Sequence, residues 1–199
     1  SEATFLGADE PEIATAAGEL VENFPQMGRA QMTAFVRTLW ASGIYELQAV
    51  GTRVLAARAE LLEPADLPFV EDLLQKCDVD ELARTLADEA LGALASKSKK
   101  VWRDLKKMST GKDMRLRRAA VRSCRLPVHA DEAMLPRFVE IVEPMLEAGD
   151  DEQLLATVDE VLAALAAEHS TAVADAVRDL AEQHGREIAS AGKKAKGKR

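Results

Sequence analysis

The stretch KSKKVWRDLKKMSTGKDMRLRRAAVRSCR, from Lys97 to Arg125, contains two amphipathic patterns separated by a short polar turn. In residues 112–125 four arginines fall within about 80° of one another on a helical wheel, and apolar residues occupy the other side. The cationic stripe consists of Arg115, Arg118, Arg122 and Arg125, and the apolar side of Leu116, Ala119, Ala120 and Cys124. Residues 97–109 repeat the pattern, with Lys99, Arg103 and Lys106 opposite Val101, Leu105 and Met108. The stretch therefore predicts two adjacent antiparallel helices, each with one basic face.

The same helical period recurs outward in both directions, and no window alternates with the period of two that indicates a strand. The pattern predicts ten helices, at residues 9–23, 28–42, 43–58, 64–77, 79–95, 97–109, 112–125, 131–148, 151–167 and 170–190. Pro64 suits a first helical turn, and Asp78 with Glu81 resembles a capping box. We expect Gly43 to separate two helices and Pro127 to follow one.

Short turns between helices force consecutive helices to fold back on one another. A pair then uses roughly 35–40 residues, close to the 40–47-residue period of HEAT-like arrays. We therefore predict an all-α fold, an α-α superhelix of about five HEAT-like antiparallel helix pairs with a concave face. A compact helical bundle is the alternative, disfavoured by the many short helices. We expect one domain over residues 1–190 and a disordered basic tail over residues 191–199.

The composition, 47% hydrophobic but only 4% aromatic over 199 residues, is typical of helical proteins. The longest apolar run, Val161–Ala167, is far shorter than the roughly 20 residues of a membrane span, and Ser1–Leu20 has no signal pattern. We expect a cytoplasmic protein without membrane contact. Cys77 and Cys124 lie far from each other and from the histidines, so we predict packing roles, no metal site and no cofactor.

Charge is distributed unevenly along the chain. Between Lys97 and Arg125 there are twelve basic residues against Asp104 and Asp113, a local charge of +10 in a chain whose formal net charge is −8. The rest of the chain is therefore strongly acidic, and the overall charge is a poor guide to binding partners.

Four short motifs occur in order within a similarity that runs from about residue 5 to about residue 180. They are Phe5-Leu6-Gly7 with Pro11 and Ile13, Leu39-Trp40-Ala41-Ser42 with Tyr45-Glu46, Leu62-Glu63-Pro64-Ala65-Asp66-Leu67, and Leu116-Arg117-Arg118-Ala119-Ala120-Val121. In this order they resemble AlkD-like DNA alkylation repair proteins. The resemblance implies a solenoid of HEAT-like repeats that binds duplex DNA on a basic concave face. Active members of that family are DNA glycosylases that remove positively charged alkylpurines.

The resemblance also implies where catalytic residues would lie, as two tryptophans and an aspartate. Val79 stands at the first tryptophan position, Ala83 at the aspartate position, and an ungapped alignment puts Asp159 at the second tryptophan position. Valine and alanine supply neither a cation–π face nor a carboxylate. Asp80 survives from the motif, and we interpret it as a first-turn residue. We therefore assign no catalytic residue and lean against an enzyme.

Two other carboxylates, Glu81 and Asp88, could in principle take the place of the catalytic aspartate. We instead expect Glu81 to cap a helix and Asp88 to be exposed to solvent. Trp40 and Trp102 lie beside apolar positions, so we expect both to anchor helix packing rather than to stack on bases. No phosphate-loop, metal-ligand or Ser-His-Asp signature is present.

The basic residues are the predicted DNA-binding set, because they lack the interspersed acids of an ordinary soluble surface. The set comprises Lys99, Arg103, Lys106, Lys107, Arg115, Arg118, Arg122 and Arg125. Arg118 falls where the resemblance places a DNA-contacting arginine. The competing interpretations are a solvated helix face and a strip of internal salt bridges to the acidic repeats.

Three functions stay open at this point. The first is binding of double-stranded DNA, damaged or distorted, without cleavage of the glycosidic bond. The second is a glycosylase with a rearranged active site, and the third is a HEAT-like scaffold whose basic strip docks an acidic protein partner. A concave position of Arg115, Arg118 and Arg122 would support DNA binding.

Overall fold

The computed structural model describes residues 4–149, 151–168 and 171–186. Its α-helices are α1 (Glu10–Asn23), α2 (Arg29–Ala41), α3 (Tyr45–Ala57), α4 (Leu67–Lys76), α5 (Asp80–Thr85), α6 (Gly92–Lys97), α7 (Lys99–Ser109), α8 (Met114–Ser123), α9 (Arg125–Ala130), α10 (Leu135–Ala148), α11 (Glu152–Glu168) and α12 (Thr171–Gln183). Short 3-10 turns occur at Ala59–Leu61, Pro64–Asp66 and Glu132–Met134, and the π-helical turn η3 (Leu86–Leu91) joins α5 to α6. Within these ranges the β pairing is limited to one isolated bridge between Thr4 and Ile44.

Each predicted helix coincides with an observed one, and the differences lie at the ends. The predicted helix 79–95 is the continuous segment α5–η3–α6, which ends at Lys97. The helix predicted over 112–125 is α8, which ends at Ser123, and Pro127, which we expected to follow a helix, lies inside the next helix, α9. Proline is tolerated there because the N–H groups of a first helical turn have no partner within the helix. The last predicted helix was too long, since α12 ends at Gln183; residues 187–190 and the predicted tail 191–199 lie outside the described residues.

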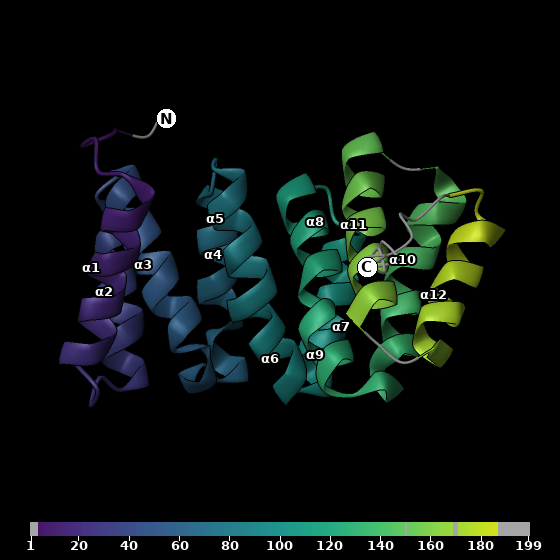
Figure 1. Cartoon of the computed structure of the whole chain (residues 1–199), viewed down its shortest axis with the longest axis horizontal. Helices are drawn as coiled ribbons and strands as arrows, with labels where there is room; N and C mark the ends of the chain where they lie inside the picture. The colour runs from purple at the N-terminus through teal and green to yellow at the C-terminus, as the bar shows by residue number, and fades with distance from the viewer. Residues whose placement is uncertain (1–3, 150, 169–170, 187–199) are drawn as a thin grey trace, which may run out of the picture.

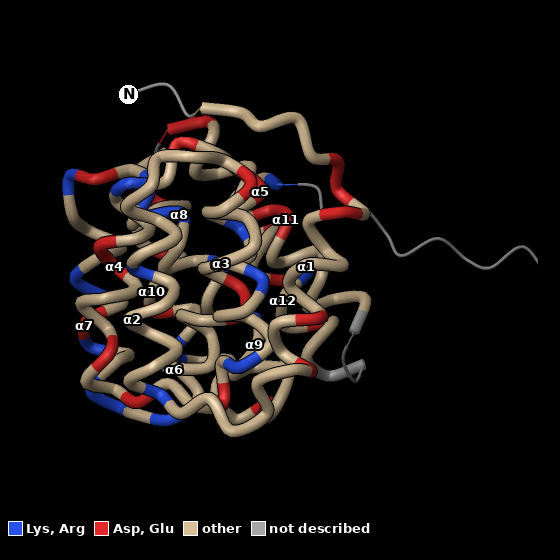
Figure 2. The backbone as a smooth tube through the Cα atoms, turned by 90° about the vertical axis from the view of Figure 1, so that its left-hand side faces the viewer, with Lys and Arg blue, Asp and Glu red and all other residues tan. Residues whose placement is uncertain are grey.

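The helices form two packed rows, which confirms the predicted all-α superhelix. An outer row consists of α2, α4, α7 and α10, and an inner row of α3, α5–η3–α6, α8–α9 and α11. Viewed along the long axis, α7 and α4 lie at one side and α1 and α12 at the other, with α3 and α9 between them (Figure 2). Because α1 packs on α3 and α12 on α11, the two flank the inner row at opposite ends (Figure 1). Between them no other helix of the described part covers the inner row.

Apolar stripes of the two rows meet in a continuous core. On α7 Val101 and Leu105 are buried, and on α8 Ala119 and Ala120 are buried, as the periodicity predicts. Trp102 is buried and donates its Nε1–H to the carbonyl of Ala95 at 3.0 Å. The apolar faces of the two basic helices therefore point into the core, and their basic faces point away from it.

Trp40, Cys77 and Cys124 are also buried, which agrees with the packing roles predicted for them. Burial raises the pKa of the Cys77 and Cys124 thiols, so both stay protonated at neutral pH. No helix within the described ranges is both long and apolar enough to cross a membrane.

Candidate functional site

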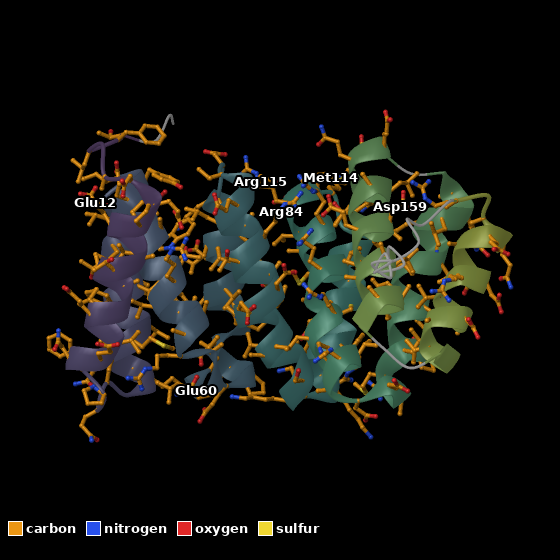
Figure 3. All side chains as sticks on the ribbon, in the orientation of Figure 1. Glu12, Glu60, Arg84, Met114, Arg115 and Asp159 are labelled. Atoms are coloured by element: carbon orange, nitrogen blue, oxygen red, sulfur yellow. The ribbon has the colours of Figure 1, made fainter. Side chains whose placement is uncertain are left out.

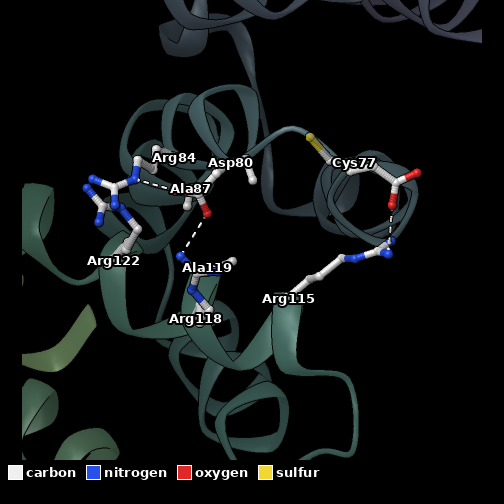
Figure 4. Close-up of a pocket in the computed structure, with 10 residues that line it drawn as sticks. Cys77, Asp80, Arg84, Ala87, Arg115, Arg118, Ala119 and Arg122 are labelled. Atoms are coloured by element: carbon white, nitrogen blue, oxygen red, sulfur yellow. Dashed lines mark hydrogen bonds and ion pairs between the residues drawn. The ribbon is translucent and has the colours of Figure 1, made fainter. Parts of the chain in front are cut away.

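The N-terminal ends of α5 and α8 lie close together on the inner row. Asp113 caps α8, because its side chain accepts hydrogen bonds from the N–H groups of Arg115 at 2.9 Å and Leu116 at 3.4 Å. Helix α5 begins at Asp80, next to α8. A cleft of about 170 Å³ opens here (Figure 4). It is lined by Cys77, Asp78, Asp80, Ala83, Arg84, Ala87, Arg115, Arg118, Ala119 and Arg122.

Asp80 is held by two arginines from different helices. Its Oδ1 accepts from Nη2 of Arg118 at 2.7 Å, and its Oδ2 accepts from Nε of Arg84 at 2.8 Å. Arg118 also donates from Nε to the hydroxyl of Thr157 on α11 at 3.2 Å. Asp80 and Arg118 thereby join three helices of the inner row.

Arg122, one turn further along α8, is the most enclosed arginine of the cleft, with 13% of its side chain exposed. Its Nε and Nη2 donate to the two oxygens of Asp88 on η3, at 3.2 and 3.1 Å, a two-pronged arrangement that favours arginine. Its Nη1 donates to Glu160 on α11 at 2.8 Å, and Glu160 also lies 3.2 Å from Arg84. The predicted solvent exposure of Asp88 is therefore wrong, because only 21% of its side chain is exposed and it is paired.

Arg115 lies at the outer end of the cleft, with 47% of its side chain exposed. Its Nη2 is 2.8 Å from Asp78, and its Nη1 donates to the carbonyl of Gln75. Figure 3 places Arg84 and Arg115 between α5 and α8. Since Asp78 pairs with Arg115 and Val79 is the N-cap of α5, the capping box predicted for Asp78 and Glu81 does not form.

Four arginines and four carboxylates thus neutralise one another around the cleft. Although burial raises the pKa of Asp80, the hydrogen bond from Arg84 and the charge of Arg118 outweigh it and hold that pKa below 3.8. The pKa of Glu160 is likewise lowered below 4.5, because Arg122 and Arg84 outweigh the effect of burial. Both carboxylates are therefore ionised at neutral pH, and the cleft has almost no net charge of its own.

The positions that the resemblance assigns to catalysis lie at or near this cleft without catalytic groups. Val79 precedes α5, and Ala83 is part of the cleft wall. Asp159 does not line the cleft; it pairs with Arg186 and lies nearer α12 (Figure 3). The cleft wall contains no aromatic side chain. Within the described residues no group of three His, Cys, Asp or Glu side chains could hold a metal ion.

The residues of the predicted DNA-binding set lie at three separate places in the structure. Arg115, Arg118 and Arg122 lie together on the inner row, between α5 and α8. The cations of α7 belong to the outer row; they are Lys99, Arg103, Lys106 and Lys107. Arg125 begins α9 and lines a separate hollow with Asp88, Glu89, Leu126 and His129. The two basic helices are adjacent as predicted, but they present their cations on different sides of the array.

Sequence reasoning missed the acidic half of this site. Asp80 and Arg84 are four residues apart in the sequence, a spacing typical of ion pairs on one helix face, and that signal was available. The pairs of Arg122 with Asp88 and Glu160 join residues more than thirty positions apart, and only the packing of the rows reveals them. The internal salt-bridge strip, a competing interpretation of the basic sequence, is present here.

Fold and cleft together define an all-α helical-repeat protein whose inner row carries a cleft of mutually paired arginines and carboxylates. The chain belongs to the DNA alkylation repair enzyme family, whose sequence profile matches residues 1–194, and this confirms the AlkD-like resemblance. No curated protein and no solved structure matches the chain. Family membership connects the chain with DNA repair.

Proposed function

We propose that this chain is a member of the DNA alkylation repair family that binds duplex DNA and does not break the glycosidic bond. One observation carries the proposal: the cleft at the family's catalytic position has alanines at positions 83 and 87, and its carboxylate Asp80 is already bound by two guanidinium groups. In this proposal the chain keeps the fold of the family, but its cleft lacks the side chains that base excision requires.

Excision of an alkylated base requires a negative charge near the sugar, where positive charge develops as the bond breaks. The charge of Asp80 is compensated by Arg84 and Arg118, so it is poorly suited to stabilise a further cation. An alkylpurine also needs an aromatic surface, worth about 0.5–2 kcal/mol per cation–π contact. With Val79 and Ala83 at the family positions, neither requirement is met.

Duplex binding requires only surface cations, and it needs neither an aromatic pocket nor a free carboxylate. It depends on cations that meet phosphates and release condensed counterions, and it leaves a steep salt dependence as its signature. The chain keeps four exposed lysines and one exposed arginine on α7 even though its formal net charge is −8. Family membership and this retained basic surface support DNA as the partner.

Two measurements on the full chain test the proposal. Duplexes containing 7-methylguanine or 3-methyladenine are incubated with the protein, and released base is measured against the spontaneous rate and against an active glycosylase. We expect no release above the spontaneous rate. Binding of an undamaged duplex is measured in parallel over a range of salt, with log K expected to fall linearly with log salt.

Both halves of the proposal can fail separately. Base release that disappears in the Asp80→Asn variant would establish a glycosylase with a rearranged active site. Absence of duplex binding at low salt would remove DNA as a direct partner and leave a protein scaffold.

A further inference from the structure

Helix α7 presents a row of cations on the outer row, on the side away from the core. Five basic residues lie on its exposed surface, namely Lys99, Lys100, Arg103, Lys106 and Lys107. Opposite them the buried residues Val101 and Leu105 fix the helix against its neighbours. Figure 2 shows α7 at the edge of the molecule opposite α1 and α12.

These cations are available to an external anion, in contrast to the arginines of the cleft. In the described part of the chain no carboxylate lies within 4.0 Å of Lys99, Lys100 or Arg103. The two pairs that do form leave both lysines exposed: Lys106 is 3.3 Å from the exposed Glu140, and Lys107 is 2.8 Å from Asp104, whose side chain is 24% exposed. Exposed pairs of this kind contribute little to stability, and phosphate oxygens can replace the carboxylates.

The first turn of α7 carries positive charge, although an α-helix is stabilised by negative charge at this end. Lys99 and Lys100 are its first two residues, and the turn contains no acidic residue. Because a helix N-terminus carries a partial positive charge, lysines there are electrostatically unfavourable for the helix. Helix stability therefore does not account for these two cations, and a bound polyanion would offset their electrostatic cost.

A neighbouring helix extends the basic surface. Arg137 of α10 lines a shallow hollow of about 280 Å³ together with Arg103 and Lys106. Trp102, Glu140 and Ile141 complete the lining, so the hollow has three cations and one carboxylate. On the other flank Asp104 lies near Glu71 of α4, so the basic surface extends toward α10 and not toward α4.

We propose that the outer basic face, defined as Lys99, Lys100, Arg103, Lys106, Lys107 and Arg137, takes the phosphate backbone of duplex DNA. This inference rests on the proposed function and names the surface that carries it. It departs from the concave-face binding that the family resemblance implies for Arg118, because the inner-row arginines are paired with Asp78, Asp80, Asp88 and Glu160.

The dimensions of the face suit a phosphate backbone. From Lys99 to Lys106 the helix rises about 10 Å, a length of duplex that carries on the order of three phosphates on each strand. Lys99, Arg103 and Lys106 repeat at spacings of four and three residues and so lie along one side of α7. Arg137 adds a fourth contact from α10. About four contacts predict a slope of log K against log salt near −3.6.

The test compares three variants of the full chain, with binding of one fluorescent duplex measured at several salt concentrations. The first variant, Lys99→Gln/Arg103→Gln/Lys106→Gln, removes three cations of the outer basic face. The second, Arg115→Gln/Arg118→Gln, removes two cations of the cleft. The matched control, Arg53→Gln/Lys76→Gln/Arg178→Gln, removes three partly exposed cations elsewhere and lowers the net charge by the same amount. Circular dichroism melting confirms that each variant is folded.

We expect the outer-face variant to bind about five hundredfold more weakly near 0.1 M salt, with a slope less negative by about 2.7. The cleft variant and the matched control should stay within about threefold of the unmodified chain. The inference would be overturned if the cleft variant lost duplex binding while the outer-face variant kept it.

Absence of duplex binding by the unmodified chain would instead refute the proposed function. Stronger binding of a poly-glutamate peptide than of the duplex would favour an acidic protein partner over DNA.

Discussion

Arg118 of α8 and Asp80 of α5 form an ion pair of 2.7 Å across the inner row, and Thr157 of α11 accepts a second hydrogen bond from the same arginine. One turn along, Arg122 repeats this bridge with Asp88 and Glu160. The arginine stripe that the sequence presents as a DNA-binding surface is therefore also the electrostatic connection between three segments of the inner row.

Replacement of Arg122 should reduce stability, because it leaves the half-enclosed Asp88 without its partner. We expect Arg122→Met to lower the free energy of unfolding by about 1–3 kcal/mol, measured by urea denaturation at pH 7. The comparison variant is Arg178→Met, whose exposed partner Asp175 lies three residues away on the same helix. It should change stability by less than about 0.5 kcal/mol. Equal effects in the two variants would show that the Arg122 bridge has no special structural role.

The lowered pKa values of Asp80 and Glu160 predict a loss of stability in acid. A carboxylate whose pKa is lower in the folded chain stabilises the fold above its unfolded pKa, here 3.8 for Asp80 and 4.5 for Glu160. That contribution disappears as pH falls from about 5 through the lower folded values.

The variant Asp80→Asn/Glu160→Gln isolates this contribution. It should be less stable than the unmodified chain at pH 7, and the difference in unfolding free energy should shrink steadily below about pH 5. Urea denaturation at a series of pH values measures both. A difference that stays constant down to pH 3 would contradict the assigned ion pairs.

Gly92 permits the close approach of α6 to α9. A Cβ atom there would lie 3.0 Å from Cβ of Leu126 and 3.4 Å from the carbonyl oxygen of Ser123. Gly92→Ala should therefore destabilise the chain by about 1–3 kcal/mol through overpacking. At Gly18 of α1, where a Cβ would meet nothing within 4 Å, the same substitution should stabilise by about 0.4–1 kcal/mol. Thermal melting of the two variants, which we expect to shift in opposite directions, distinguishes packing from helix propensity.

Glu46 fixes the segment that precedes α1. Its Oε1 accepts from the N–H groups of Leu6 and Gly7, both at 2.7 Å, and these bonds, the one from Leu6 foremost, lower the pKa of its carboxyl. We expect Glu46→Gln to loosen the segment and to accelerate chymotrypsin cleavage after Phe5, whose ring is exposed. Mass spectrometry of the early fragments measures the rate. Glu19→Gln, at an exposed position of α1, is the control, and an equal rate in both would disprove the anchoring role.

Local sequence was sufficient to predict the helices and the buried faces of α7 and α8, because hydrophobic periodicity is a property of neighbouring residues. Local sequence was insufficient at Pro127 and at Asp88. Pro127 looked like a helix end, yet its place in a first turn of α9 made it compatible with a helix. Asp88 looked like a solvent-exposed residue until η3 turned it toward Arg122.

The same division applies to the candidate site. The AlkD-like resemblance pointed to Val79 and Ala83 without any structure, because the residues compared with the family pattern lie close together in the chain. The partners of the arginines could not be found in this way. Asp80 and Arg118 are separated by 38 residues, and their contact depends on how α5 packs beside α8.

The sequence by itself determined that this chain is a helical array, that it resembles a DNA repair family, and that Val79 and Ala83 stand where the resemblance implies an aromatic and an acidic side chain. Each of these is a property of residue types at short spacing. Only the tertiary structure decided which basic residues still carry an available charge. A charge is neutralised by whatever lies within a few ångströms of it, and folding brings Asp80, Asp88 and Glu160 to the arginines of α8 while leaving most cations of α7 at the surface.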